Sequence, residues 1–302
     1  MSTLTIREFT DPGCPWAFSA EPSRYRLRWL YGEEIEWRHT MVGLSERPED
    51  VAAKGFTPDV EARALTTMQR RFGMPIDPLE RPRNAATMPA CRAVVAARLH
   101  APEREEALLR RLRVNAMAGH LLDAPETLAL SASEAGLDPA ELEHWAAGPD
   151  TAEALRADIA AARAPSAAAL ALDHKLADSP DGRRYTCPSY EIARADGTTR
   201  LDLPGFQPAD AYEVAIANLA PELARRGKPE SVEEVLAWAG EPLATAEVAA
   251  VCEMKTIKAR EALARVARER PVGADGYWTL GDEGSDPGVE AAEPALLLAP
   301  VT

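Results

Sequence analysis

The feature that most constrains the fold is a short strand pattern that is followed at once by a cysteine and a helical pattern. Residues 3–9 alternate apolar and polar side chains, which is typical of a strand, and residues 14–31 have a helical composition. Cys14 therefore lies where a strand ends and a helix begins. Pro15 fits the first helical turn, because its missing N–H would have no partner there. A thiol in this place meets free backbone N–H groups and the positive end of the helix dipole, which favour the reactive thiolate.

The strand patterns come in two groups that are separated by a long helical region. Residues 34–42 predict a second strand, parallel to the first because a helix connects the two. Residues 57–180 contain prolines at plausible first helical positions and leucines at helical spacing, so we expect a helical insertion there. Strand patterns return at residues 185–193 and 198–203, joined by an Asp-Gly turn, and a helix is predicted at residues 208–223.

The stretch Asp11-Pro12-Gly13-Cys14-Pro15-Trp16-Ala17 resembles the active-site turn of the DsbA-like thioredoxin-fold oxidoreductases, including their cytosolic FrnE-like branch. That family often carries Asp-Pro-x-Cys-Pro-Trp-Cys after its first strand, and this chain matches the first cysteine, the proline and the tryptophan. The resemblance covers about residues 3–225. It implies an α/β fold, namely a thioredoxin fold whose single sheet is interrupted by a large all-helical insertion at about residues 57–180.

The same resemblance implies which residues form the active site. Cys14 is the candidate catalytic residue, and the family's second cysteine is replaced by Ala17, so the usual Cys-x-x-Cys disulfide cannot close. Pro188 matches the family's cis-proline, which faces the active-site cysteine, and Cys187 would then lie beside Cys14. We expect the Cα atoms of these two cysteines to be within or slightly above the range of roughly 4.4–6.8 Å that disulfides require, with both thiols reduced at rest.

Several candidate residues have two interpretations that the sequence leaves open. Cys187 either replaces the missing second cysteine or is a small apolar residue that packs there. Trp16 either lines a substrate groove or packs as a core aromatic. His39, on the second predicted strand, is either a base near the site or a hydrogen-bonded strand residue. Cys91 and Cys252 lie in helical patterns, and we expect them in the core.

The composition of the chain limits the classes of partner that we expect it to bind. Its 302 residues carry a formal net charge of −14 with a pI near 4.9, which argues against a general binder of nucleic acids or anionic membranes. The four cysteines are too scattered for metal-ligand spacing or for a secreted disulfide framework, so no metal is expected. The sequence shows neither a secretory signal pattern nor an apolar run of membrane-spanning length, so we expect a cytoplasmic protein without a membrane partner.

The C-terminal part predicts a second unit. A polar linker at residues 225–229 divides a domain over residues 1–227 from a module over residues 228–281, whose three helices and hairpin resemble a winged helix. One helix of this module is basic, but residues 229–302 contain 14 acidic and 6 basic side chains, so nucleic-acid binding is not expected. The acidic residues 282–302 are predicted to be a loosely ordered tail.

Two classes of function remain open. The first is a thiol–disulfide oxidoreductase that acts through Cys14 alone and forms a mixed disulfide with a protein or with glutathione. A variant is a glutathione-dependent enzyme similar to kappa-class glutathione transferases and 2-hydroxychromene-2-carboxylate isomerases, which carry a serine where this chain has Cys14. The second class is a non-catalytic protein that has lost its active site and serves regulation or assembly. No tightly bound cofactor is expected, and glutathione is the candidate co-substrate.

Overall fold

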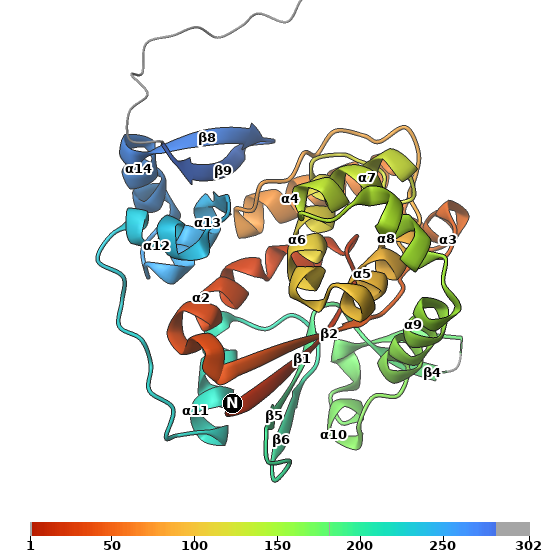
Figure 1. Ribbon diagram of the computed structural model, residues 1–302, viewed down its shortest axis with the longest axis horizontal. Coiled ribbons are helices and arrows are strands. Elements are labelled where there is room, and N and C mark those ends of the chain that lie inside the picture. The colour runs from red at the N-terminus through yellow and green to blue at the C-terminus, as the bar shows by residue number, and fades with distance from the viewer. Residues whose placement is uncertain (1, 181, 282–302) are drawn as a thin grey trace, which may run out of the picture.

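A four-stranded sheet joins the two groups of strands. The computed structural model describes residues 2–180 and 182–281. Strands β1 (Leu4–Thr10) and β2 (Ile35–Met41) are parallel, whereas β5 (Ser189–Arg194) is antiparallel to β1 and β6 (Arg200–Leu203) is antiparallel to β5. The strand order is β2-β1-β5-β6 (Figure 1). The prediction of one sheet from strands on either side of a helical insertion is therefore confirmed.

The first predicted helix is interrupted. It consists of α1 (Pro15–Ser19) and α2 (Glu21–Tyr31), with Ala20 between them. Pro22 stands in the first turn of α2 and has no N–H to donate to the preceding turn, so one continuous helix cannot form. The short α1 remains at the end of β1, while α2 buries Leu27 and Trp29 in the same apolar cluster as Leu4 and Ile6 of β1.

The insertion between β2 and the later strands is helical, as predicted, but it starts earlier than residue 57. Several of its helices begin with proline, and Asp138 caps one of them by accepting hydrogen bonds from the N–H groups of Ala140 and Glu141. The helices are α3 (Pro48–Ala53), α4 (Pro58–Phe72), α5 (Met88–His100), α6 (Glu105–Met117), α7 (Pro125–Glu134), α8 (Pro139–Ala146), α9 (Pro149–Ala162) and α10 (Ala167–Leu170). Short 3-10 turns accompany them at Pro102–Arg104 and Asp173–Lys175, and another, at Gly32–Glu34, lies between α2 and β2.

The prediction of a strand at residues 185–193 is wrong at its N-terminal end. Residue 185 instead ends β4 (Gly182–Tyr185), which pairs with β3 (Leu176–Ser179) in a separate two-stranded sheet. The chain then turns through residues 186–188 before β5 begins at Ser189, because Pro188 has no N–H to extend a strand ladder. The predicted Asp-Gly hairpin joins β5 and β6, and the helix predicted after it is α11 (Ala209–Leu219).

The C-terminal segment contains the predicted three helices and hairpin, and a short strand that was not predicted. Its elements are α12 (Val232–Ala239), β7 (Leu243–Ala244), α13 (Thr245–Val251), α14 (Thr256–Val266), β8 (Ala267–Val272) and β9 (Asp275–Leu280). The strands form a sheet in the order β7-β9-β8. The winged-helix assignment and the division at residues 227 and 228 stay predictions, and the predicted tail at residues 282–302 lies outside the described residues.

This segment shares an apolar cluster with elements that precede it in the chain. Val248 and Leu263 belong to the apolar cluster that also contains Leu27 of α2 and Ile192 of β5. Figure 1 shows the segment, in blue, beside the helical insertion, with α2 next to both. The apolar faces of the segments on either side of the polar linker therefore pack together.

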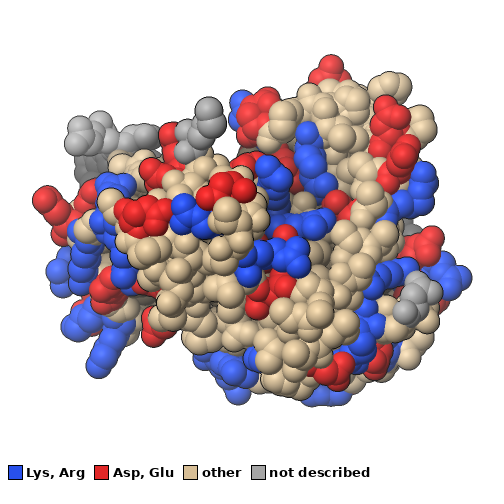
Figure 2. All heavy atoms as spheres, turned by 90° about the horizontal axis from the view of Figure 1, so that it is seen from below, with Lys and Arg blue, Asp and Glu red and all other residues tan. Residues whose placement is uncertain are grey.

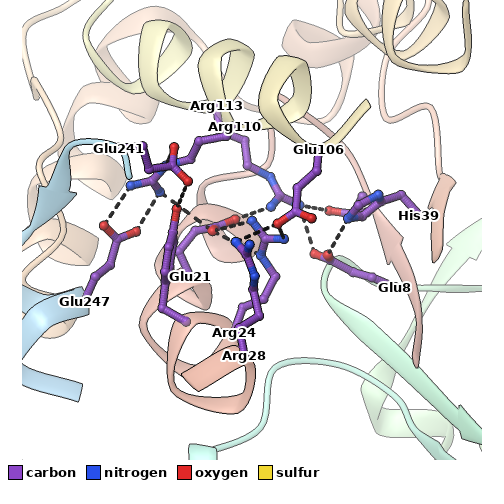
Figure 3. Close-up of polar contacts among 12 residues, drawn as sticks. Glu8, Glu21, Arg24, Arg28, His39, Glu106, Arg110, Arg113, Glu241 and Glu247 are labelled. Atoms are coloured by element: carbon purple, nitrogen blue, oxygen red, sulfur yellow. Dashed lines mark hydrogen bonds and ion pairs between the residues drawn. The ribbon is translucent and has the colours of Figure 1, made fainter. Parts of the chain in front are cut away.

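Buried ion pairs connect the same three parts (Figure 3). Arg110 of α6 donates to both carboxylate oxygens of Glu247 of α13, at 2.6 and 2.7 Å. Arg113, also on α6, donates to Glu8 of β1 at 2.9 Å and to Glu21 of α2. These side chains are at most 1% exposed, so the pairs are screened little by water or salt. The network fixes α6 against the sheet, α2 and the C-terminal segment.

Candidate active site

Cys14 is the N-cap residue of α1, with an extended backbone and Pro15 following as the first helical residue. Its N–H donates to the carbonyl oxygen of Asp11 at 3.1 Å, and its own carbonyl accepts the N–H of Phe18 at 3.1 Å. The residue is 5% exposed. The structure thus has Cys14 where the sequence predicted it, between the end of β1 and the start of a helix.

Asp11 organises the turn that carries Cys14. Its carboxylate accepts the N–H of Gly13 at 2.9 Å through Oδ1, and the N–H of Leu44 at 2.8 Å and the hydroxyl of Thr87 at 2.9 Å through Oδ2. The thiol of Cys91 also contacts Oδ2, at 3.4 Å. Burial raises the pKa of Asp11, and these hydrogen bonds oppose that effect. One carboxylate therefore ties the turn to the end of β2 and to the start of α5.

Sequence reasoning did not single out Asp11, although the motif contained it. The signal was an aspartate two residues before a glycine, which is typical of a side chain that accepts a hydrogen bond from the backbone two residues on. Gly13 is also required for space, because a Cβ there would lie 2.5 Å from Cγ2 of Thr87. The contact with Thr87 had no local signal, since one strand and four α-helices separate that residue from the turn in sequence.

The turn before β5 brings Cys187 to Cys14. The peptide bond between Cys187 and Pro188 is cis, as the resemblance implied. The Sγ of Cys14 contacts the carbonyl oxygen of Cys187 at 3.6 Å, and all four cysteines of the chain are free. Ala17, which stands in place of the second cysteine, is buried at 1% exposure.

The two thiols have opposite ionisation preferences. A hydrogen bond from the Cys187 thiol, together with the N–H groups of Ala17 and Trp16, lowers the pKa of Cys14, although burial and the charge of Asp11 oppose it. Burial, the hydrogen bond to Cys14 and the charge on Cys14 raise the pKa of Cys187 well above its ordinary value. Of the two, Cys14 is therefore the more acidic thiol, and the Cys187 thiol is its hydrogen-bond donor.

A cavity of about 400 Å³ opens onto both cysteines. Most of its lining is uncharged, and the charged side chains in it are Lys54, Arg81, Arg83, Arg184 and Glu61, of which Arg83 is paired with Asp123 outside the lining. Lys54 donates to the carbonyl oxygen of Leu44, and Arg184 to that of Tyr185. Arg81 likewise donates to backbone carbonyls only. Within the described parts of the chain, none of these three cations has a carboxylate within ion-pair distance, so the cavity is suited to an anionic ligand.

This local excess of positive charge contrasts with the surface as a whole. On the face shown in Figure 2, acidic and basic side chains are mixed rather than separated into large patches. The chain as a whole carries a net charge of −14. The cations of the cavity come from the loop after α3, the loop before α5 and strand β4, so no single stretch of sequence indicated them.

Trp16 forms the rim of the cavity. It is 40% exposed, and its ring packs edge-on against Phe72 and Phe206, with ring centroids 5.6 and 5.7 Å away. The guanidinium of Arg71 lies 5.9 Å from the same ring. This exposed position beside Cys14 fits a groove residue better than a core aromatic.

The other candidates lie away from the cavity. His39 is buried on β2, 3.8 Å from Glu8 and 3.6 Å from Glu105, and is not among the residues that line the cavity. Cys252 is in the apolar cluster of the C-terminal segment. Among residues 2–180 and 182–281, no three His, Cys, Asp or Glu side chains are grouped to hold a metal ion. Within the same residues, no helix is long and apolar enough to cross a bilayer.

A family model for the DSBA-like thioredoxin domain matches residues 5–167, which is more than half of the chain. The chain belongs to the DSBA-like thioredoxin family. The match begins in β1, includes the Cys14 turn and ends in α10. The resemblance that the sequence motif indicated is therefore confirmed.

Solved structures agree with this DSBA-like fold. A candidate protein disulfide isomerase from Nitrosomonas europaea is 16% identical with a TM-score of 0.55, over 73% of this chain and 99% of that one. A probable DsbA oxidoreductase from Streptomyces coelicolor is 19% identical with a TM-score of 0.50, over 75% and 93%. The cytosolic disulfide reductase DsbM from Pseudomonas aeruginosa is 22% identical with a TM-score of 0.49, over 72% and 100%. At such identities the first two likenesses show the fold alone. No curated protein matches the chain significantly.

Proposed function

We propose that this DSBA-like protein is a thiol–disulfide oxidoreductase that acts through Cys14. The observation that carries the proposal is a cysteine with a lowered pKa at a helix start, in contact with the cis-proline turn and open to a cavity. The Cys14 thiolate attacks one sulfur of a substrate disulfide, the Cys14–substrate bond forms, and the other sulfur leaves as a thiolate that takes a proton. Because Ala17 carries no thiol, the mixed disulfide is not resolved from within the Cys14 turn.

We further propose glutathione, or its disulfide, as the co-substrate. Glutathione has one thiol and two carboxylates, and the cavity offers Lys54, Arg81 and Arg184 without carboxylate partners. A carboxylate placed among these cations would gain charge-assisted hydrogen bonds in a partly buried setting. The reducing cytoplasm, where glutathione is abundant, is the compartment in which such chemistry operates.

A second candidate is a glutathione-dependent transferase or isomerase of the kappa type. The observation that favours it is the small volume of the cavity, about 400 Å³, which suits a small molecule. In that reaction the thiolate of bound glutathione is the nucleophile, and Cys14 remains free of covalent attachment. The non-catalytic alternative is disfavoured by the lowered pKa of Cys14, since an inert buried cysteine would have a raised one.

The proposal is tested by the reactivity of Cys14 across pH. We expect alkylation by iodoacetamide, mapped to the Cys14 peptide, to reach half its maximal rate below the ordinary cysteine pKa of about 8.5. Oxidised glutathione should add one glutathione to Cys14, which a transferase would not retain. Cys14→Ser should abolish both products, whereas Cys252→Ala, a matched change of a distant cysteine, should leave them intact. An alkylation midpoint above about 8.5 would contradict the proposal.

A further inference from the structure

Cys187 stands where a second redox cysteine can act, although it lies 173 residues from Cys14 in sequence. We propose that Cys187 is the resolving thiol of Cys14, so that the redox pair is divided between the Cys14 turn and the cis-proline turn. This inference rests on the proposed function, because it needs a mixed disulfide on Cys14 as its starting point.

The geometry that supports the pair is fixed on both sides. Cys14 is held by the turn around Asp11, and its Sγ contacts the Cys187 carbonyl at 3.6 Å. The cis-proline turn is anchored by Thr186, whose hydroxyl donates to the carbonyl of Lys175 at 2.8 Å. It is anchored again by Ser189, whose hydroxyl donates to the carbonyl of Thr186 at 2.6 Å. The side chains of the two cysteines share a hydrogen bond, and the turns that carry them are both anchored, which favours reaction between the two thiols.

The position that holds the resolving cysteine in the family motif offers no thiol here. Ala17 is 1% exposed and packs in the same apolar cluster as Cys14 and Cys187. Cys91 is also near the turn, but its thiol contacts the carboxylate of Asp11, and burial together with that charge raises its pKa well above the ordinary value. Of the four cysteines, Cys187 is the one in direct contact with Cys14.

The state of Cys14 influences the acidity of Cys187. In the resting protein, burial is the main cause that raises the pKa of Cys187, and the hydrogen bond to Cys14 and the charge on Cys14 raise it further. When Cys14 is bound in a mixed disulfide, its sulfur carries no charge. It then neither accepts a strong hydrogen bond from the Cys187 thiol nor repels a negative charge there, so these two contributions to the raised pKa of Cys187 are lost. Arg184, which lines the same cavity, favours the ionised form. Cys187 thus becomes more acidic at the step at which it must attack.

The reaction balances without any further group. The Cys187 thiolate attacks the Sγ of Cys14, the Cys14–substrate bond breaks, and the substrate sulfur leaves with the proton that Cys187 released. The products are one free thiol and a Cys14–Cys187 disulfide. Two molecules of a low-molecular-weight thiol such as glutathione then reduce this disulfide, yielding their own disulfide and restoring both cysteines.

The test follows the fate of the mixed disulfide in the full-length protein. Reduced protein is mixed with oxidised glutathione, quenched in acid at intervals, and analysed by intact mass and peptide mapping. For the wild type we expect a transient glutathione adduct that gives way to a species lacking two hydrogen atoms, mapped to Cys14 and Cys187. In Cys187→Ser and Cys187→Ala the adduct should persist, with complete loss of the internal disulfide.

The outcomes separate the two proposals. Cys252→Ala should behave as the wild type, and circular dichroism should show that both Cys187 variants are folded. If the wild-type adduct persists as long as that of the Cys187 variants, Cys187 is not the resolving thiol, while the role of Cys14 stands. If neither the wild type nor the Cys187 variants form an adduct at Cys14, and the wild type forms no Cys14–Cys187 disulfide, the proposed function and this inference are both overturned.

Discussion

At the residue scale, Asp11 has two opposing effects on Cys14. Its hydrogen bonds to Gly13, Leu44 and Thr87 hold the turn in shape, but its negative charge raises the pKa of the Cys14 thiol. The carboxylate of Asp11 therefore stabilises the turn but makes the Cys14 thiol less acidic. A substitution that keeps the size of the side chain and removes its charge can separate these two effects.

Asp11→Asn is predicted to make Cys14 more acidic and the protein less stable. Loss of the charge should shift the midpoint of Cys14 alkylation to lower pH. The amide has one acceptor oxygen, so one of the buried donors loses its partner, at a cost of about 1–3 kcal/mol. Urea unfolding and alkylation across pH measure the two effects. A midpoint that rises in Asp11→Asn would show that turn geometry, and not charge, sets the reactivity of Cys14.

At the scale of elements, the contact between α6 and α13 depends on a buried ion pair. Arg110 and Glu247 are 1% and 0% exposed, and they join the insertion to the C-terminal segment (Figure 3). Removing one partner leaves a buried charge without compensation, which typically costs about 3–5 kcal/mol. Replacing both partners by apolar residues of similar size can avoid that cost, and Glu21, which lies 3.7 Å from Arg110, keeps Arg24 and Arg113 as partners.

We therefore predict that Glu247→Gln alone strongly lowers the free energy of unfolding, whereas Arg110→Met combined with Glu247→Leu lowers it less. Chemical denaturation of the three proteins measures the difference. The matched control is Glu261→Gln, which breaks the exposed pair with Lys258 and should leave the free energy of unfolding almost unchanged, because water and salt screen that pair. Equal losses for Glu247→Gln and Glu261→Gln would show that the buried pair does not hold α13 in place.

At the scale of the whole molecule, the buried network predicts sensitivity to acid. Burial alone would raise the pKa of Glu21, but Arg24, Arg113 and Arg110 outweigh it and lower the pKa to about 2. The folded value is below the ordinary 4.5, so the ionised carboxylate stabilises the fold above about pH 4.5. This contribution, about 3 kcal/mol, is lost as the pH falls toward 2.

We expect the free energy of unfolding to fall steeply below about pH 4.5 in the wild type and less steeply in Glu21→Gln, which has no such carboxylate to protonate. Urea titrations at several pH values measure these slopes, whatever the absolute stability of the variant. Identical slopes in the two proteins would mean that other carboxylates account for the acid sensitivity.

The sequence could predict what depends on local pattern. Strand alternation and prolines at helix starts predicted the sheet and the helical insertion. The Cys14 motif predicted the family and, through it, the cis bond before Pro188. The ion network and the basic cavity could not be predicted, because their members come from distant elements and each looks like an ordinary surface charge. The break at Ala20 had a local signal in Pro22 that was not used, whereas the packing of the C-terminal segment depends on apolar faces that meet only in the folded chain.

The distance of 173 residues between Cys14 and Cys187 links the redox equilibrium of the chain to its folding. Two thiols in a Cys-x-x-Cys motif remain neighbours when a protein unfolds. Cys14 and Cys187 have a high effective concentration only in the native state, because in the unfolded chain they are the ends of a long flexible loop. By thermodynamic linkage, a bond between them would favour the fold by about 5 kcal/mol in the chain-entropy description. Anything that loosens the fold, such as heat, acid or urea, would by the same linkage make the oxidised pair easier to reduce.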